Sequence, residues 1–236
     1  MRLLPSRSFG LAVVLCFCCA IATAAEPAGA APDVSARQSP RNVAIFAFQG
    51  MELLDFAGPG EVFQAVGQKF KVYTVAESTE PIVSQGFVKI VPEYSIHNCP
   101  KPDLLVIPGG ATAATLKNPD VIAWVKRVSD ETEITMSVCT GAFVLAKAGL
   151  LDGQEATTHW FHLSRLGKSA PNIQVRSDVR FVDTGRIVTT AGVSAGIDGA
   201  LHVVQRLLGQ KTAERVAKGM EYKWIEAIAP EDAVSK

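Results

Sequence analysis

The strongest constraint on the fold comes from residues 137–151, SVCTGAFVLAKAGLL, where a cysteine separates two different apolar patterns. A β-branched, apolar run at residues 133–138 leads directly into Cys139, and an Ala-rich segment with helical spacing follows. This order predicts a strand, a sharp turn and a helix, with the thiol at the helix N-terminus. The unpaired N–H groups there favour thiolate over thiol, so we expect a lowered pKa for Cys139. The alternative is a small, inert core residue, the usual role of a free cysteine.

Other apolar runs of strand length alternate with helical patterns along the chain. Continuous runs such as VAIFAF (43–48) and LLVI (104–107) suit parallel strands that are buried on both faces. Helical spacing is found at residues 61–66, 118–129 and 195–208. The alternation predicts one α/β domain with a mainly parallel central sheet and helices on both faces. A chain of 236 residues, 48% of them hydrophobic, can bury such a core.

Several classes of protein are disfavoured by what the sequence lacks. No Gly-x-Gly-x-x-Gly follows a strand pattern and no Gly-x-x-x-x-Gly-Lys is present, which argues against a dinucleotide site and a P-loop. Cysteines and histidines do not cluster at metal-ligand spacing, so we expect neither a metal nor a cofactor. The formal net charge is zero, and we expect no nucleic-acid partner.

Two further candidate positions follow strand patterns, where open α/β sheets bind their ligands. Asp55 lies in an apolar segment after the first strand pattern, and Pro59 is expected in the first turn of the next helix. On this information alone, a helix N-cap is the simpler role for Asp55. Gly109 and Gly110 end the second strand pattern, where glycines let the backbone approach a ligand or present free N–H groups. A simple turn explains the two glycines equally well.

The N-terminus has the pattern of a secretory signal peptide. Arg2 and Arg7 flank a basic start, an apolar run follows, and ATAA at residues 22–25 offers small-residue cleavage sites. We expect a signal peptide at 1–25, a disordered linker at 26–40, the folded domain at 41–228 and a C-terminal tail at 229–236. The mature protein would be periplasmic or secreted and without stable membrane association. A lipoprotein is the less favoured alternative.

Cleavage of the signal peptide would leave two cysteines, Cys99 and Cys139. An exported protein meets an oxidising compartment, in which two thiols can pair. We expect these two to stay unpaired, because Cys99 precedes Pro100 in a loop that leads to a different strand.

Five motifs in a fixed order connect these observations: LLDFAGPGEVF (53–63), VIPGG (106–110), SVCTGAFVLAKAGLLDG (137–153), ATTHW (156–160) and AGVSAGID (191–198). Together they closely resemble the DJ-1/PfpI superfamily, from about residue 41 to residue 222. The resemblance implies a flavodoxin-like three-layer sandwich of the class I glutamine amidotransferase-like type. Two branches are nearest. One is the isonitrile hydratase group, which adds water to an isocyanide to give an N-substituted formamide, and the other is the amidotransferase-like sensor domain of AraC-type regulators.

The resemblance also implies catalytic roles for three residues. Cys139 matches the nucleophile of the superfamily, and Asp55 matches the acidic residue that contacts this cysteine. Thr140 matches the residue after the nucleophile, which is also Thr in the hydratase branch. The protease-like and glyoxalase-like members carry His at that position as a partner base. Since Thr140 stands there in this chain, the resemblance does not extend to peptidase or glyoxalase activity.

Further positions match the surroundings of that nucleophile. The backbone N–H groups of Gly110 and Thr140 match an oxyanion-hole-like donor pair, with Gly109 beside them. His159 matches a pocket histidine of some relatives, and packing at a helix start is an equally good explanation for it. Asp198, on the last core helix pattern, is expected to be structural.

The function favoured by these observations is that of an exported, cysteine-dependent hydratase. Its partner would be a small, isocyanide-like substrate, and its expected assembly is a homodimer, as is common among such relatives. Two alternatives remain. One is a ligand- or redox-sensing domain without enzymatic activity, and the other is a stress-response or deglycase-like protein.

Overall fold

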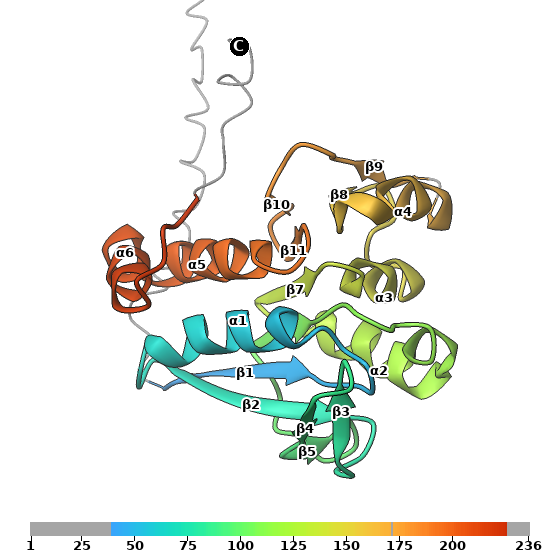
Figure 1. The fold of residues 1–236 in the computed structure, drawn as a ribbon, viewed down its shortest axis with the longest axis horizontal. Helices are drawn as coiled ribbons and strands as arrows, with labels where there is room; N and C mark the ends of the chain where they lie inside the picture. Colours follow the sequence, from blue (N-terminus) through green and yellow to red (C-terminus); the bar gives the residue numbers. More distant parts are fainter. Residues whose placement is uncertain (1–38, 171, 226–236) are drawn as a thin grey trace, which may run out of the picture. The chain divides into compact units, whose positions relative to one another are not determined.

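A computed structural model describes residues 39–170 and 172–225 (Figure 1). The expected signal peptide, most of the expected linker, residues 226–228 and the expected tail lie outside the described residues. Seven strands form one sheet in the order β10-β11-β7-β6-β1-β2-β5. In that order their bounds are Phe181–Asp183, Ile187–Thr190, Ile134–Val138, Leu104–Ile107, Arg41–Phe46, Phe70–Ala76 and Tyr94–Ser95. Neighbouring strands are parallel, except that β10 and β11 form an antiparallel pair.

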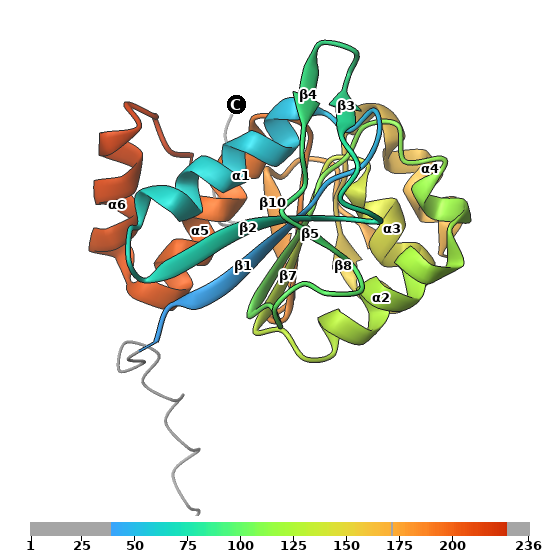
Figure 2. The ribbon, with the colours of Figure 1, turned by 90° about the horizontal axis from the view of Figure 1, so that it is seen from below.

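Helices cover both faces of this sheet, as Figure 2 shows. One face carries α1 (Leu53–Ala65), α5 (Ala195–Leu208) and α6 (Gln210–Gly219). The other carries α2 (Pro119–Ser129) and α3 (Gly141–Lys147), with α4 (Leu163–Ser169) beside α3. Short 3₁₀ turns lie at Thr115–Lys117 and Trp160–His162. Smaller sheets pair β3 (Ile82–Ser84) with β4 (Val88–Ile90) and β8 (Glu155–Ala156) with β9 (Gln174–Val175). The predicted flavodoxin-like α/β class is confirmed.

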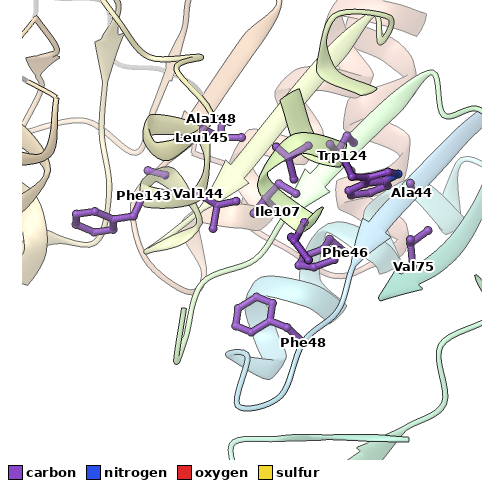
Figure 3. Close-up of a cluster of buried hydrophobic side chains, with 14 of the residues drawn as sticks. Ala44, Phe46, Phe48, Val75, Ile107, Trp124, Phe143, Val144, Leu145 and Ala148 are labelled. Carbon is purple, nitrogen blue, oxygen red and sulfur yellow. The ribbon is translucent and has the colours of Figure 1, made fainter. Parts of the chain in front are cut away.

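The apolar runs of the sequence explain the central strands. All four side chains of β6 and all five of β7 are buried, as two-sided packing requires. On one face, Phe46 of β1 packs on Trp124 of α2 with ring centroids 5.7 Å apart (Figure 3). The other face packs against the apolar sides of α1, α5 and α6. The two cores therefore fix the sheet rigidly beneath the loops at its carboxyl edge.

A local signal sets the start of α2, whereas α1 begins without a side-chain cap. The Asn118 side chain accepts hydrogen bonds from the N–H groups of Asp120 and Val121 at 3.0 and 3.3 Å, and so caps α2. The first helix begins at Leu53, so Pro59 lies inside it. Our expectation that Pro59 would lie in the first turn is therefore wrong. Because proline has no N–H, the backbone carbonyl of Asp55 lacks its usual helical donor.

The strand order places the candidate residues at one edge of the sheet. From β1 the chain adds β2 on one side, and β6, β7 and β11 follow on the other. The switch in direction falls between β1 and β6, and sheets of this kind bind ligands at the carboxyl ends of the strands at such a point. Asp55 follows β1, Gly109 follows β6 and Cys139 follows β7. Three segments that are distant in the sequence thus meet at this edge.

The described residues contain neither a membrane-spanning helix nor a metal-binding cluster. None of their helices is long and apolar enough to cross a lipid bilayer. Within the same residues, no group of three or more His, Cys, Asp or Glu side chains could hold a metal ion.

Candidate active site

Cys139 occupies a strained turn between β7 and α3. Its φ is 55°, in the left-handed region that non-glycine residues rarely adopt. Three hydrogen bonds hold this backbone. The N–H of Cys139 donates to the carbonyl of Ala191 at 3.1 Å, and its own carbonyl accepts from Ala142 N–H at 3.3 Å and from Thr158 Oγ1 at 2.6 Å. The side chain is only 7% exposed. The turn therefore presents a nearly buried sulfur at the carboxyl edge of the sheet.

Asp55 lies fully buried in the first turn of α1. Its Oδ2 accepts a hydrogen bond from the N–H of Gly109 at 2.9 Å, and its Oδ1 has no hydrogen-bond partner. The N-cap of α1 is Glu52, whose side chain makes no capping bond, so the simpler capping role does not apply to Asp55. A buried carboxyl group with one oxygen that lacks a hydrogen-bond partner is costly to keep ionised.

The two side chains perturb each other's ionisation. Burial raises the pKa of Asp55 from 3.8 to about 7, and the Glu52 charge raises it further. The hydrogen bond from the Gly109 N–H opposes the shift, and the nearby Cys139 thiol and Val193 N–H oppose it to a smaller extent. The pKa of Cys139 is raised to about 12, and burial is the largest cause of this shift and the charge of Asp55 the second largest. Our expectation of a lowered pKa for Cys139 is therefore wrong. The N–H and hydroxyl of Thr140 do lower it, but loss of water around the sulfur outweighs them.

Because burial raises both pKa values and leaves that of Cys139 well above that of Asp55, the pair holds one proton between them. That proton has two arrangements, a thiol beside a carboxylate or a thiolate beside a carboxylic acid. Moving it between sulfur and oxygen adds no net charge to the buried site. The pair can generate a thiolate and an adjacent acid in one step.

The Thr140 side chain connects the Cys139 turn to the loop of Gly109 and Gly110 after β6 by hydrogen bonds. Its Oγ1 accepts from the N–H of Gly110 at 2.9 Å and lies 3.1 Å from the Gly110 carbonyl, to which it donates. The Gly110 N–H is thus engaged within the loop, and the donor pair of Gly110 and Thr140 stays a prediction. A Cβ on Gly109 would lie 2.6 Å from Thr140 N and 2.8 Å from Asp55 Oδ2. Glycine at position 109 is what permits this close approach.

His159 lies beside the loop that holds the cysteine turn. Its Nδ1 accepts from the N–H of Phe161 at 3.3 Å, so it caps the short 3₁₀ turn. Its ring packs so closely on Gly192 that a Cβ there would meet Cδ2 at 2.2 Å. These contacts correspond to the packing role that the sequence left open. Trp160, in contrast, is 72% exposed and belongs to neither core.

Sequence reasoning missed Val193, which completes the surroundings of Asp55. Its φ is 53°, a conformation that is especially costly for a β-branched residue. Its backbone N–H lowers the pKa of Asp55. The glycines of the AGVSAG motif signalled a tight turn at this place, but nothing in a valine signals a left-handed backbone. Glu52 was missed as well, although it precedes the motif that contains Asp55.

The fold and this site define a family. Residues 41–206 match the model of the DJ-1/PfpI family, and the chain belongs to that family. Its structure resembles that of a THiJ/PfpI family protein from Pseudomonas syringae. The TM-score is 0.73 at 30% sequence identity, and the match covers 91% of this chain and 87% of the other. The family resemblance of the five motifs is confirmed.

Two relatives of different function are similar in sequence. Isonitrile hydratase of Pseudomonas putida is 34% identical over 179 residues, which are 74% of this chain and 75% of the relative. The HTH-type transcriptional regulator CdhR of Pseudomonas aeruginosa is 27% identical over 150 residues. That match covers 63% of this chain but 44% of the regulator.

Proposed function

We propose that this protein is a cysteine-dependent hydratase that converts small isocyanide-like substrates and water into N-substituted formamides. The similarity to isonitrile hydratase of Pseudomonas putida supports this reaction class. The observation that carries the proposal is the buried pair of Asp55 and Cys139. With a pKa of about 7 for Asp55, the pair supplies both a nucleophile and a proton donor near neutral pH.

In the first step, the Cys139 sulfur and the Asp55 proton both add to the terminal carbon of the isocyanide. Cys139, as thiolate, forms a carbon–sulfur bond, and the proton of Asp55 passes to the same carbon. The product is a thioimidate, R–N=CH–S–Cys139, beside an ionised Asp55. The Thr140 N–H, which stabilises the thiolate, keeps the sulfur oriented during the attack.

The second step uses Asp55 as a base and then again as an acid. It takes a proton from the water that attacks the thioimidate carbon, and passes this proton to the nitrogen. The carbon–sulfur bond then breaks, and the hydroxyl proton returns to Asp55 as the carbonyl forms. N-substituted formamide leaves, and the pair regains its thiolate and carboxylic acid. Atoms and charges balance without a cofactor.

The burial of the site fits this substrate class. Cys139 is 7% exposed and Asp55 is fully buried, so a broad acyl group has little room to reach the sulfur. An isocyanide is slender and linear, and its reacting carbon is at the tip. It also carries no net charge, which suits a site that already disfavours ionisation.

The test is incubation of the full chain with cyclohexyl isocyanide, followed by NMR detection of N-cyclohexylformamide. We expect formamide from the wild type and only the uncatalysed background from Cys139→Ala. Absence of formamide from the folded wild type, or equal rates from both proteins, would overturn the hydratase proposal.

A second candidate is a sensing domain that binds a ligand at the same site without turnover. The similarity to the transcriptional regulator CdhR favours it. Oxidation of Cys139 to sulfinic acid, tuned by Asp55, would be one form of such sensing. A ligand that raises the melting temperature of the wild type without being converted would support this candidate over the hydratase.

We also propose that the protein is exported and acts as a homodimer. The signal-peptide pattern at residues 1–25 supports export. Mass spectrometry of the protein secreted from an expressing bacterium tests it, because cleavage at residues 22–25 gives a defined mass. Sedimentation equilibrium of the same sample tests the dimer. An intact N-terminus or a monomer mass would contradict the respective proposal.

A further inference from the structure

Thr158 makes a buried contact with the cysteine turn that no step of the proposed reaction uses. It lies shortly after β8, and its side chain is buried. Its hydroxyl donates to the carbonyl of Cys139 at 2.6 Å, at the short end of the usual range for a hydroxyl donor. A second donor to this carbonyl, the Ala142 N–H, lies 3.3 Å away, beyond the usual range for an N–H donor. The Thr158 hydroxyl is therefore the stronger of the two partners.

The Cys139 backbone depends on such contacts because it is strained. A left-handed φ at a non-glycine residue persists only where the surrounding contacts over-determine it. The Ala191 carbonyl, just after β11, accepts from the N–H of Cys139 at 3.1 Å. Thr158 holds the carbonyl of the same residue. Two segments that are distant in the sequence thus fix the cysteine turn, one at its N–H and the other at its carbonyl.

The anchored carbonyl also sets the direction of the next N–H. The Cys139 carbonyl and the Thr140 N–H belong to one planar, trans peptide unit, so the two bonds point in opposite directions. Since the carbonyl points to Thr158, the Thr140 N–H points to the opposite side of the turn. Thr140 N and Asp55 Oδ2 both lie against Gly109, at 2.6 and 2.8 Å from the position that a Cβ there would take. The Thr140 N–H is thus held beside the Asp55 carboxyl.

We propose that Thr158 is a positioning residue, whose hydroxyl holds the Cys139–Thr140 peptide so that the Thr140 N–H stays on the side of Asp55. The inference rests on the proposed function only in assigning a reaction to Cys139. Without the hydroxyl, the buried carbonyl would keep only its long hydrogen bond from Ala142, and rotation of the peptide would withdraw the Thr140 N–H. The proposal gives a role to a threonine of the ATTHW motif that the sequence left unassigned.

Thr157 provides a matched control in the same segment. Its side chain is also buried, and its hydroxyl donates to the carbonyl of Arg176 at 2.8 Å rather than to the cysteine turn. Its backbone N–H donates to Thr189 Oγ1 at 2.9 Å, a contact that a change of the Thr157 side chain leaves in place. Thr157→Val and Thr158→Val therefore each remove one hydroxyl and its hydrogen bond to a carbonyl. Only Thr158→Val frees the peptide after Cys139.

The first measurement follows the Cys139–Thr140 peptide directly in the full chain. The dipeptide Cys-Thr occurs once in the sequence, so labelling Cys carbonyls with ¹³C and Thr nitrogens with ¹⁵N gives a single NMR peak for this peptide. We expect the Thr140 N–H to exchange with deuterium at least about tenfold faster in Thr158→Val than in Thr157→Val, because only the former frees the peptide to rotate. Thr158→Ser keeps the hydroxyl and should stay within about threefold of the wild-type exchange rate.

The second measurement is turnover of cyclohexyl isocyanide. Thr158→Val should lower kcat by about 10- to 100-fold with KM within about threefold, because the Thr140 N–H acts on the reacting sulfur. The wild-type pH–rate profile should show an inflection near pH 7, where Asp55 ionises. Thr158→Val should keep this inflection, since the Gly109 N–H still donates to Asp55. Thr157→Val and Thr158→Ser should stay within about threefold of the wild-type kcat.

Equal exchange rates in folded Thr158→Val and Thr157→Val, or equal values of kcat in these two variants, would overturn the proposal. Circular dichroism establishes folding, and Thr158→Ala carries the same predictions if Thr158→Val does not fold. The exchange of the Thr140 N–H can be measured whether or not isocyanide is converted. Faster exchange in Thr158→Val without formamide from the wild type would keep the hold on the peptide and reject the hydratase. Formamide from the wild type with equal exchange rates would reject only the positioning role.

Discussion

Cys139 and Cys99 are two free thiols on opposite faces of one sheet, and their surroundings differ in kind. At both, burial is the largest cause of a raised pKa. Next to Cys99, the Trp124 side chain and the Arg127 charge lower the pKa. Next to Cys139, the charge of Asp55 raises it to about 12. Thiol acidity alone therefore gives Cys139 no advantage over Cys99.

What distinguishes Cys139 is the means to move its proton. Asp55 ionises near pH 7 and can take the thiol proton and give it to a substrate. The side chains that act on Cys99 are those of Trp124 and Arg127, and neither of them can take a proton near neutral pH. On the proposed function, the reactivity of Cys139 therefore comes from its carboxyl partner and its strained turn, not from the acidity of the thiol.

Replacing each cysteine with alanine should give the largest difference in activity between the two sites. We expect Cys139→Ala to lower kcat/KM for cyclohexyl isocyanide by more than about 10³-fold, since the nucleophile is lost. Cys99→Ala should stay within about twofold of the wild type, because it has no part in the reaction. Formamide production measured by NMR decides the matter. Comparable losses in both variants would remove the distinction between the two thiols.

Asp55→Asn tests whether the carboxyl partner makes the difference. Asparagine keeps the size and accepts the Gly109 N–H, but it cannot exchange a proton near neutral pH. We expect turnover to fall by about 10²- to 10⁴-fold and the inflection near pH 7 to disappear from the pH–rate profile. An inflection that survives in Asp55→Asn would assign it to another group.

The buried Asp55 should also make the stability of the protein depend on pH. The pKa of Asp55 is raised from 3.8 to about 7 on folding, so the folded chain keeps a proton that the unfolded chain has lost. The contribution of Asp55 to the free energy of unfolding therefore falls as pH rises from about 4 to about 7, by on the order of 4 kcal/mol.

Urea denaturation at pH 4.5 and pH 7.5 measures this decline. The fall in the free energy of unfolding should be absent in Asp55→Asn. It should persist in Cys99→Ala, because Asp55 is intact in that variant. A wild type whose stability relative to Asp55→Asn is the same at both pH values would show that the carboxyl is ionised throughout.

Much of this arrangement could be predicted from the sequence, because it depends on local patterns. The buried apolar runs gave the strands, and Asn118 gave the start of α2. The positions of Asp55, Gly109 and Cys139 followed from a general rule, that parallel strands place their carboxyl ends at one edge.

The electrostatics could not be predicted in the same way, because they depend on three-dimensional burial. The helix-terminus argument for Cys139 was sound in direction, yet the sequence did not show how little water reaches the sulfur. Nor did it show that Thr140 Oγ1 would engage the Gly110 N–H. The left-handed backbone of Val193 is the clearest case, since only contacts from distant segments maintain it.

Gly110→Ala should reveal how tightly the edge around Cys139 is packed. The φ of Gly110 is 114°, and an added Cβ would lie 2.4 Å from Glu52 N. We expect a loss of about 3 kcal/mol in the free energy of unfolding, because backbone must move. The matched control is Gly185→Ala, which has a φ of 96° and nothing within 4 Å of the added Cβ. Strain alone should cost it about 1 kcal/mol. Equal losses of unfolding free energy in the two variants, measured by urea denaturation, would mean that the backbone around Gly110 moves at little cost.

His159→Ala should have the smallest effect, and it defines where the surroundings of Cys139 end. The change removes one long hydrogen bond to Phe161 N–H and the ring that packs on Gly192. We expect a stability loss of about 1 kcal/mol and a fall in turnover of less than about tenfold, with the inflection near pH 7 unmoved. The pH–rate profile of formamide production checks this. A loss as large as that of Asp55→Asn would mean that His159 touches the substrate, and the proton pair would then have a third member.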